Sequence, residues 1–152
     1  MAKAPVPGRV KTRLCPPCTP RQAARLAAAA LADTMDAVRA CAAQRRVLAL
    51  DRPVGAGTDG FALVAQRGAG LGARIAAGFA DAAAAGARSV LQIGMDTPQL
   101  TGDLLDGCLT TLRAPGVDAV LGPAEDGGWW ALGLHDPAHA TLLTTVTMST
   151  PD

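Results

Sequence analysis

Hydrophobic residues recur along the chain in two alternating patterns, one helical and one typical of strands. Helical spacing and alanine-rich runs predict helices over three stretches: residues 20–44, 71–86 and 102–114. Short apolar runs predict strands at five places: residues 45–51, 61–66, 89–96, 117–123 and 128–134. This alternation predicts an α/β fold with a mostly parallel central sheet and crossover helices.

The first predicted helix has the clearest start. Thr19 is expected to cap it, and Pro20 suits the first helical position. Four larger apolar side chains mark its predicted buried face: Leu26, Leu31, Met35 and Val38. Much of the remaining apolar content is alanine, so we expect a core of thin side chains and close helix contacts.

Composition narrows the class of protein. The 152 residues suffice for a single domain, residues 1–152, with a buried core. A net charge of +1 and 3% aromatic residues argue against a general nucleic-acid binder, which needs excess positive charge and stacking side chains. No apolar run approaches the roughly 20 residues of a membrane span, and no signal peptide is recognisable. We therefore expect a cytoplasmic protein with no membrane partner.

Cysteine spacing gives little indication of metal or redox chemistry. Cys15 and Cys18 form one CxxC, within CPPC, without the second pair or the histidines of a zinc site. A redox CxxC usually opens a helix, whereas two prolines place this one in a loop. We therefore expect no function for this pair.

The segment AKAPVPGRVKTRL, Ala2 to Leu14, is the most basic part of the chain. It contains four cations: Lys3, Arg9, Lys11 and Arg13. Cations and backbone N–H groups in a loop are suited to polyphosphate, and Gly8 allows close backbone approach. The last three cations alternate, so an extended segment would point them the same way. The alternative is a solvated basic terminus.

Asp96 lies in IGMDTPQL, at the end of a predicted buried strand. Open α/β sheets bind ligands at the carboxyl ends of their strands. A single carboxylate there suits Mg²⁺ or Mn²⁺, because waters and substrate phosphates complete the coordination shell. The alternative is an aspartate that only caps the turn.

A second acidic motif, GPAEDGGWW, covers residues 122–130. Glu125 and Asp126 precede a glycine pair that begins at Gly127. A hairpin turn explains Asp-Gly without any function. The acids could also supply a second metal ligand or hold a sugar hydroxyl, so Asp126 and Gly127 are included among the expected binding residues. The two tryptophans that follow are expected to face opposite sides of a strand.

The glycine-rich stretch QRGAGLGAR, residues 66–74, does not fit a dinucleotide fingerprint. Gly68, Gly70 and Gly72 give GxGxG rather than GxGxxG, and no acidic residue ends a following strand at the required distance. A nucleotide or substrate loop at a helix N-terminus is the preferred interpretation, with Arg74 one turn into the helix.

Four of these motifs, taken in order, resemble a bacterial family labelled as glycosyltransferases: AKAPVPGRVKTRL, QRGAGLGAR, IGMDTPQL and GPAEDGGWWALGL. Their fold is the nucleotide-diphospho-sugar transferase fold of the GT-A type. More distantly, KTRL is similar to the end of the phosphate loop in phospholactate guanylyltransferases. The Gly-x-Asp-x-Pro pattern around Asp96 is similar to one in molybdenum cofactor guanylyltransferase. The resemblance implies that Arg9, Lys11 and Arg13 hold phosphates. It also implies that Asp96 holds Mg²⁺ and that Asp126 corresponds to a family acid.

The resemblance also raises an expectation about both ends. Members of the family begin with an apolar strand before the basic loop and continue past MSTP with a helix and a further strand. We therefore expect a domain that lacks its first strand and its C-terminal elements. A first strand would lie in the middle of the sheet, so its absence would expose edges on both neighbours.

The leading hypothesis is a Mg²⁺-dependent transferase that moves a nucleotidyl group from an NTP, or a sugar from an NDP-sugar, to a small-molecule acceptor. Lys11, Arg13 and the metal on Asp96 would neutralise the charge that develops on the phosphates. A non-catalytic nucleotide-binding regulatory or scaffold domain is the alternative. RNA binding through the basic loop is a weaker interpretation, because the chain is nearly neutral.

Overall fold

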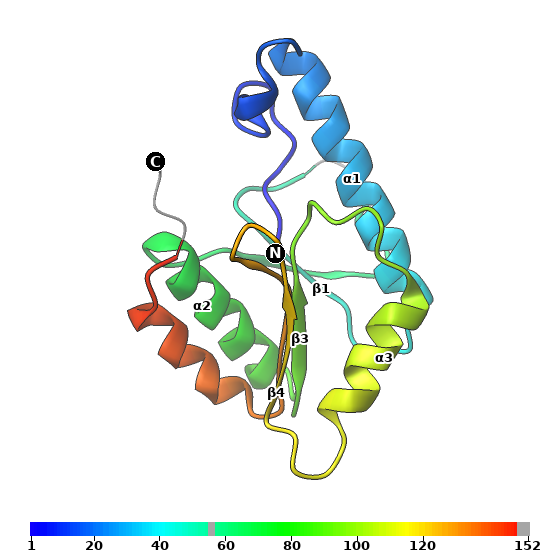
Figure 1. The fold of residues 1–152 in the computed structure, drawn as a ribbon, viewed down its shortest axis with the longest axis vertical. Coiled ribbons are helices and arrows are strands. Elements are labelled where there is room, and N and C mark those ends of the chain that lie inside the picture. Colours follow the sequence, from blue (N-terminus) through cyan, green and yellow to red (C-terminus); the bar gives the residue numbers. More distant parts are fainter. Residues whose placement is uncertain (55–56, 149–152) are drawn as a thin grey trace.

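The computed structural model describes residues 1–54 and 57–148, which form three layers (Figure 1). Helices α1 (Pro20–Ala40) and α3 (Gly102–Leu112) lie on one side of the strands. Helix α2 (Gly70–Ala84) lies on the other side. None of the described helices combines the length and the apolar composition that crossing a membrane requires. The layered α/β arrangement agrees with the alternation in the sequence.

Five described strands form two separate sheets. Strands β1 (Val47–Leu50) and β2 (Ala62–Ala65) form a parallel pair. Strands β3 (Val90–Ile93), β5 (Trp129–Leu134) and β4 (Ala119–Pro123) form an antiparallel sheet with β5 in the middle. The expectation of a mostly parallel sheet is wrong for this second sheet. A tight hairpin joins β4 to β5, and such a connection permits only antiparallel pairing.

The first two residues lie between the two sheets. The Ala2 N–H donates to the Ala49 carbonyl at 2.8 Å, and Ala2 forms a parallel bridge with Leu50. On the other side, the Met1 amino group donates to the Ile93 carbonyl at 3.1 Å. The start of the chain therefore links β1 to β3 and directs the following residues toward the carboxyl ends of both strands.

Helix α1 begins and ends where polar side chains satisfy its backbone groups. The Thr19 hydroxyl accepts from the Gln22 N–H, and the Gln22 side chain accepts from the Thr19 N–H, which forms a capping box. The helix ends at Ala40, before the expected residue 44. At that end the Arg46 guanidinium donates to the Val38 and Arg39 carbonyls, which the helix leaves free, and to the carbonyl of the cap residue Cys41.

The buried face of α1 consists mainly of alanine. Eight of its residues are buried: Ala23, Ala24, Ala27, Ala30, Leu31, Thr34, Met35 and Ala37. The expected burial of Leu31 and Met35 is confirmed, and Val38 is partly buried. The expectation for Leu26 is wrong, because its side chain is 49% exposed. The alanine stripe determines the inward face, and Leu26 lies beside that stripe.

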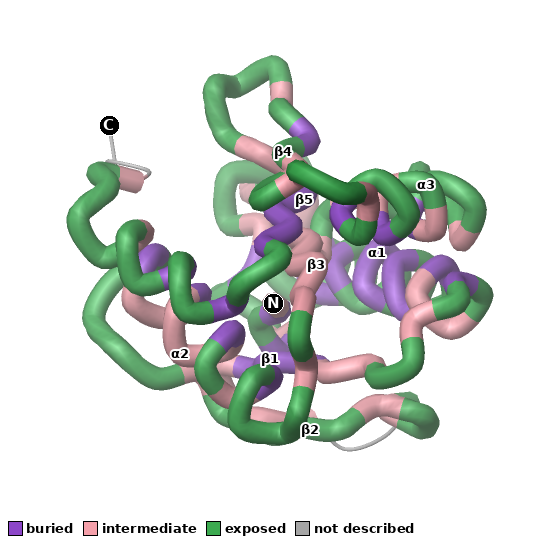
Figure 2. Tube along the Cα trace, turned by 90° about the horizontal axis from the view of Figure 1, so that it is seen from below, coloured by how far each residue is buried: buried purple, intermediate pink, exposed green. Residues whose placement is uncertain are grey.

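Apolar side chains fill both sides of the strands, and buried positions concentrate on β1 and β5 (Figure 2). On one side Leu105 of α3 belongs to a cluster that includes Trp130. On the other, Phe79 of α2 belongs to a cluster that includes Trp129. The two tryptophans therefore face opposite sides, as expected. Gly122 lies against the Trp130 ring, where a Cβ atom would not fit.

The buried Met1 amino group should make stability depend on pH. Burial lowers its pKa from 8.0 to about 6. Between these values the unfolded chain binds more protons than the folded chain, so stability rises with pH. We expect this group to make the free energy of unfolding about 2 kcal/mol higher near pH 8.5 than near pH 5.5.

Denaturant unfolding at both pH values measures this difference, with Met1 confirmed by mass spectrometry. The Nα-acetylated chain is the control, because its amide cannot titrate. Acetylation should remove this part of the pH dependence, and an identical dependence in both chains would contradict the prediction.

Candidate functional site

Loops from four parts of the chain meet at the edge where β1 and β3 end (Figure 1). The opening loop leaves the chain start at this edge, and the stretch after β2 begins there because β2 is parallel to β1. The β4–β5 hairpin reaches the same edge, since β5 begins beside the end of β3: the Gly94 N–H donates to the Trp130 carbonyl at 3.2 Å. This carboxyl-terminal edge is where α/β sheets commonly bind ligands.

An ion pair between the opening loop and the end of β3 lies at the centre of this edge. The Lys11 Nζ is 2.9 Å from Asp96 Oδ1, and the two side chains are 27% and 57% exposed. Exposed pairs of this kind contribute at most about 1 kcal/mol. The pair therefore places a cation beside a carboxylate. A ligand that separates the two groups loses little binding free energy in breaking the pair.

The opening loop is folded rather than extended. Pro7 and Gly8 occupy the centre of a turn closed by the Arg9 N–H on the Val6 carbonyl at 3.0 Å, and Gly8 has φ +77°. Lys11 is left-handed with φ 46°, and a short 3₁₀ helix, η1 (Thr12–Leu14), follows. The expectation that alternate cations point the same way is therefore wrong, because it required an extended backbone.

The other three cations of the loop are exposed: Lys3, Arg9 and Arg13. Within the described residues, none of them forms an ion pair with an acidic side chain. Their charges are therefore not paired with a carboxylate among the described residues and are available to an anionic ligand. Their assignment to phosphate binding stays a prediction.

Val10 anchors the loop, and the sequence analysis missed it. Its side chain is only 6% exposed and packs in a small cluster with Ala24 and Ala27 of α1 and with Met95. Met95 directly precedes Asp96, so this cluster holds the opening loop against the end of β3. The one signal in the sequence for this anchor was an apolar residue, Val10, between the cations Arg9 and Lys11.

Asp51 anchors the same loop from the end of β1. Its Oδ1 accepts a hydrogen bond from the Ala4 N–H at 2.7 Å. The Lys3 N–H lies 3.1 Å from the Met95 sulfur at the end of β3. Backbone N–H groups of Lys3 and Ala4 thus hold the start of the loop against β3 and β1, ahead of Arg9, Lys11 and Arg13. Only the position of Asp51 at a strand end indicated this.

The Asp126 side chain makes a hydrogen bond within its own turn. Its Oδ1 accepts from the Gly128 N–H at 3.1 Å, and Gly127 has φ +83°. The Ala124 N–H donates to the Gly128 carbonyl at 2.9 Å and closes the hairpin. The turn accounts for the Asp-Gly sequence, and a ligand role for Asp126 and Gly127 stays a prediction.

The carboxylates of Asp96 and Asp126 are the donor type that a hard divalent cation prefers, and a metal site here stays a prediction. No group of three His, Cys, Asp or Glu side chains is close enough for a metal cage within residues 1–54 and 57–148. Mg²⁺ instead uses one or two carboxylates together with phosphates and water, and Asp96 and Asp126 supply oxygen donors of this type. Beside Asp96, the buried Thr97 hydroxyl lacks a hydrogen-bond partner among the described residues.

The glycine-rich stretch after β2 is shaped by packing. Gly68 and Gly70 have φ +110° and +81° at the start of α2. Gly72 is buried, and a Cβ there would collide with the carbonyl of Leu143 in the 3₁₀ helix η2 (Pro137–Thr145). The Arg74 Nε donates to the Gly68 carbonyl at 3.3 Å. Packing explains Gly72, while the predicted nucleotide contacts of Gly70, Gly72 and Arg74 stay predictions.

Comparisons with known proteins agree with this architecture. A model for the bacterial family described as "Uncharacterized protein conserved in bacteria (DUF2064)" matches residues 23–150. A crystal structure from Desulfovibrio desulfuricans G20, described as a "putative nucleotide-diphospho-sugar transferase", superposes with a TM-score of 0.82 at 26% sequence identity. The match covers 95% of this chain and 65% of that chain. Among curated proteins, no match is found.

The structural match confirms the resemblance inferred from the sequence motifs and the α/β fold class. The chain spans less than two thirds of the length of the structure that it resembles.

A substitution at Gly72 tests whether this glycine is needed for the packing of α2 against η2. We expect Gly72→Ala to lower the free energy of unfolding by about 1–3 kcal/mol, because the added methyl group forces α2 and η2 apart. Gly107→Ala in α3 is the matched control, since its Cβ would meet nothing within 4 Å. That change should stabilise the helix by about 0.5–1 kcal/mol. Denaturant unfolding measures both, and a Gly72→Ala chain as stable as the wild type would refute the packing role.

Proposed function

Because the chain belongs to the DUF2064 family of bacterial proteins and resembles a nucleotide-diphospho-sugar transferase in structure, we propose that it is a transferase with a nucleotide-sugar substrate. One observation supports this above the others: Lys11 and Asp96 meet at 2.9 Å at the end of β3. They lie beneath a loop that carries three further cations. A cation suited to phosphate and a carboxylate suited to a metal ion are thus adjacent at the usual ligand edge of an α/β sheet.

The opening loop would bind the diphosphate of the substrate. Lys11 would exchange its contact with Asp96 for a phosphate oxygen, and Arg13 in η1 would add a second cation. Charged hydrogen bonds to phosphate are stronger than the exposed pair that they replace. Val10 and Asp51 hold the loop in place beforehand, so ordering it costs less on binding.

Asp96 would hold Mg²⁺ or Mn²⁺, with Asp126 as a second oxygen donor. When bound, the ion supplies positive charge that stabilises a diphosphate leaving group. Lys11 and Arg13 would bind oxygens of the diphosphate and stabilise the charge that develops as the bond to the sugar breaks. An acceptor molecule would attack the sugar carbon, and the nucleoside diphosphate would leave.

Nucleotidyl transfer from an NTP is the second candidate. The four cations of the opening loop favour it, because a triphosphate carries more charge than a diphosphate. In that reaction a phosphate or hydroxyl of the acceptor attacks the α-phosphorus and pyrophosphate leaves. Lys11 and Arg13 have the same role in both reactions.

Ligand titration should distinguish these reactions. Isothermal calorimetry with UDP-glucose, GDP-mannose, GTP and CTP, with and without Mg²⁺, measures the affinities. We expect a nucleotide sugar to bind more tightly when Mg²⁺ is present, because phosphate and carboxylate share the ion. Preference for an NTP would shift the assignment to nucleotidyl transfer.

Asp96→Asn is the control for the metal dependence. It should abolish the gain from Mg²⁺, because an amide oxygen is neutral. Binding that is equally tight without Mg²⁺ would instead support the non-catalytic nucleotide-binding domain. Failure of the folded chain to bind any of the four ligands would overturn the proposal.

Removal of two loop cations should weaken phosphate binding. We expect the Lys11→Ala, Arg13→Ala double variant to lose about 3 kcal/mol or more, roughly a hundredfold in Kd, since each charged hydrogen bond contributes about 1.5–3 kcal/mol. Arg113→Ala is the control for loss of a positive charge elsewhere, because it removes one exposed cation at the end of α3, away from the loop. Unchanged affinity in the double variant would rule out the loop as the phosphate site.

A further inference from the structure

The CPPC segment, Cys15 to Cys18, joins the opening loop to helix α1. The sequence alone indicates no function for this pair, because its two prolines place it in a loop. In the structure that loop leads directly into α1, since Cys18 precedes the cap residue Thr19. At the other end, Cys15 follows the last residue of η1. The two thiols therefore lie on either side of the junction between η1 and α1.

Backbone hydrogen bonds close this junction into a tight turn. The Cys15 N–H donates to the Thr12 carbonyl at 3.0 Å, and the Cys18 N–H donates to the Leu14 carbonyl at 2.8 Å. Tight turns bring Cα atoms three residues apart to within about 7 Å of each other. A disulfide usually spans about 4.4–6.8 Å between Cα atoms. The turn therefore favours a bond between these two cysteines.

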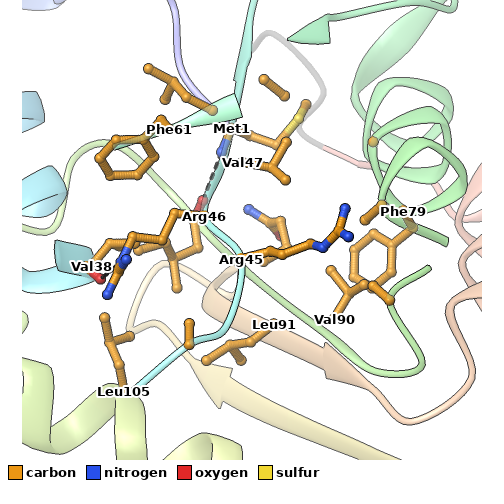
Figure 3. Close-up of a pocket in the computed structure, with 18 of the residues that line it drawn as sticks. Met1, Val38, Arg45, Arg46, Val47, Phe61, Phe79, Val90, Leu91 and Leu105 are labelled. Atoms are coloured by element: carbon orange, nitrogen blue, oxygen red, sulfur yellow. Dashed lines mark hydrogen bonds between the residues drawn. The ribbon is translucent and has the colours of Figure 1, made fainter. Parts of the chain in front are cut away.

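Solvent access distinguishes these thiols from that of Cys41. Both Cys15 and Cys18 are half-buried, so a small reagent can reach them. Cys41 borders a cleft between the two sheets, together with Val38, Phe61 and Leu105 (Figure 3). It is only 5% exposed, and its thiol donates to the Val38 carbonyl at 3.2 Å. We therefore expect Cys41 to react more slowly than the CPPC pair.

Cys108 in α3 is half-buried as well, but its thiol is less reactive. Burial raises the pKa of this thiol. A higher pKa lowers the fraction of thiolate near neutral pH, and the thiolate is the form that attacks. Reaction with a thiol reagent should therefore begin at the CPPC pair.

The residues around the pair do not complete a zinc site. A structural zinc ion needs four nitrogen or sulfur ligands. In the described part of the chain, no group of three His, Cys, Asp or Glu side chains is close enough to hold a metal ion. A bond between the two sulfur atoms needs no further residue, so disulfide chemistry fits the pair better.

The charge around the pair is positive. Arg13 lies two residues before Cys15, and Arg21 lies three residues after Cys18. Residues 1–32 contain no Asp or Glu and six cations: Lys3, Arg9, Lys11, Arg13, Arg21 and Arg25. This charge raises the local concentration of anionic reagents. Glutathione disulfide carries net negative charge at neutral pH and is therefore a suitable probe.

We propose that Cys15 and Cys18 form a reversible disulfide in reaction with an anionic small-molecule disulfide. The thiolate of one cysteine attacks that disulfide, one small thiolate leaves, and a mixed disulfide forms. The thiolate of the other cysteine attacks the mixed disulfide at the cysteine sulfur, and the second small thiolate leaves. The pair gives up two electrons and two protons, which the reagent takes up as it becomes two thiols.

The disulfide ties the end of η1 to the start of α1. Lys11 directly precedes η1, and Arg13 lies within it. Helix α1 is held in place by its buried alanine face. Oxidation therefore restrains the segment that presents these two cations at the ligand edge. This modification site acts on the opening loop whatever ligand the loop binds.

Oxidation of the full folded chain tests the proposal. The chain is incubated with glutathione disulfide, the remaining thiols are alkylated, and the peptides are analysed by mass spectrometry. We expect a bond between Cys15 and Cys18, with Cys41 and Cys108 alkylated. Oxidation should raise Tm by a few degrees, because the bond constrains the unfolded chain. It should also slow amide exchange at Cys15 and Cys18 about threefold or more, and dithiothreitol should reverse both effects.

Cys15→Ser and Cys18→Ser are the matched controls, since each leaves one thiol of the pair without its partner. Each variant should stop at the mixed disulfide with glutathione and should show no rise in Tm. The absence of an internal disulfide in the folded wild-type chain would overturn the proposal, as would a disulfide that lowers Tm or one that includes Cys41 or Cys108. Because the readouts are thiol state, stability and exchange, the result does not depend on any nucleotide activity.

Discussion

The pairing of the first two residues with both sheets determines where the candidate site lies. Ala2 is bonded to β1 and Met1 to β3, so the chain leaves the sheets at the carboxyl ends of both strands. The opening loop has to begin at that edge, and its cations stay there because Val10 is buried against α1 and Met95.

The alanine face of α1 complements this arrangement. Ala24 and Ala27 are small enough for Val10 to reach the helix, and Ala23 and Ala30 continue the buried stripe. Larger side chains there would push the loop outward and separate Lys11 from Asp96. The small alanine side chains of α1 thus also bring the opening loop close to the end of β3.

The sequence predicted the helices, the strands and the sheet edge of the candidate site better than it predicted long-range contacts. Periodicity located the helices and strands, and the strand end at Asp96 indicated the edge where the candidate site lies. The Asp-Gly turn indicated a hairpin between β4 and β5, but the pairing of β5 with β3 is long-range and had no local signal. The anchoring role of Asp51 likewise depends on a backbone N–H far away in sequence. The fold of the opening loop was missed because alternation of charges says nothing about a turn at Gly8.

The pair of Lys11 and Asp96 also affects how ligands of opposite charge act together. While the pair is intact, a ligand of either sign has to compete with it. An anion that takes Lys11 leaves the carboxylate available to a cation, and a cation that takes Asp96 leaves the ammonium available to an anion. Each ligand therefore raises the affinity for the other by the same factor. Positive heterotropic cooperativity then arises from two side chains, without movement elsewhere in the protein.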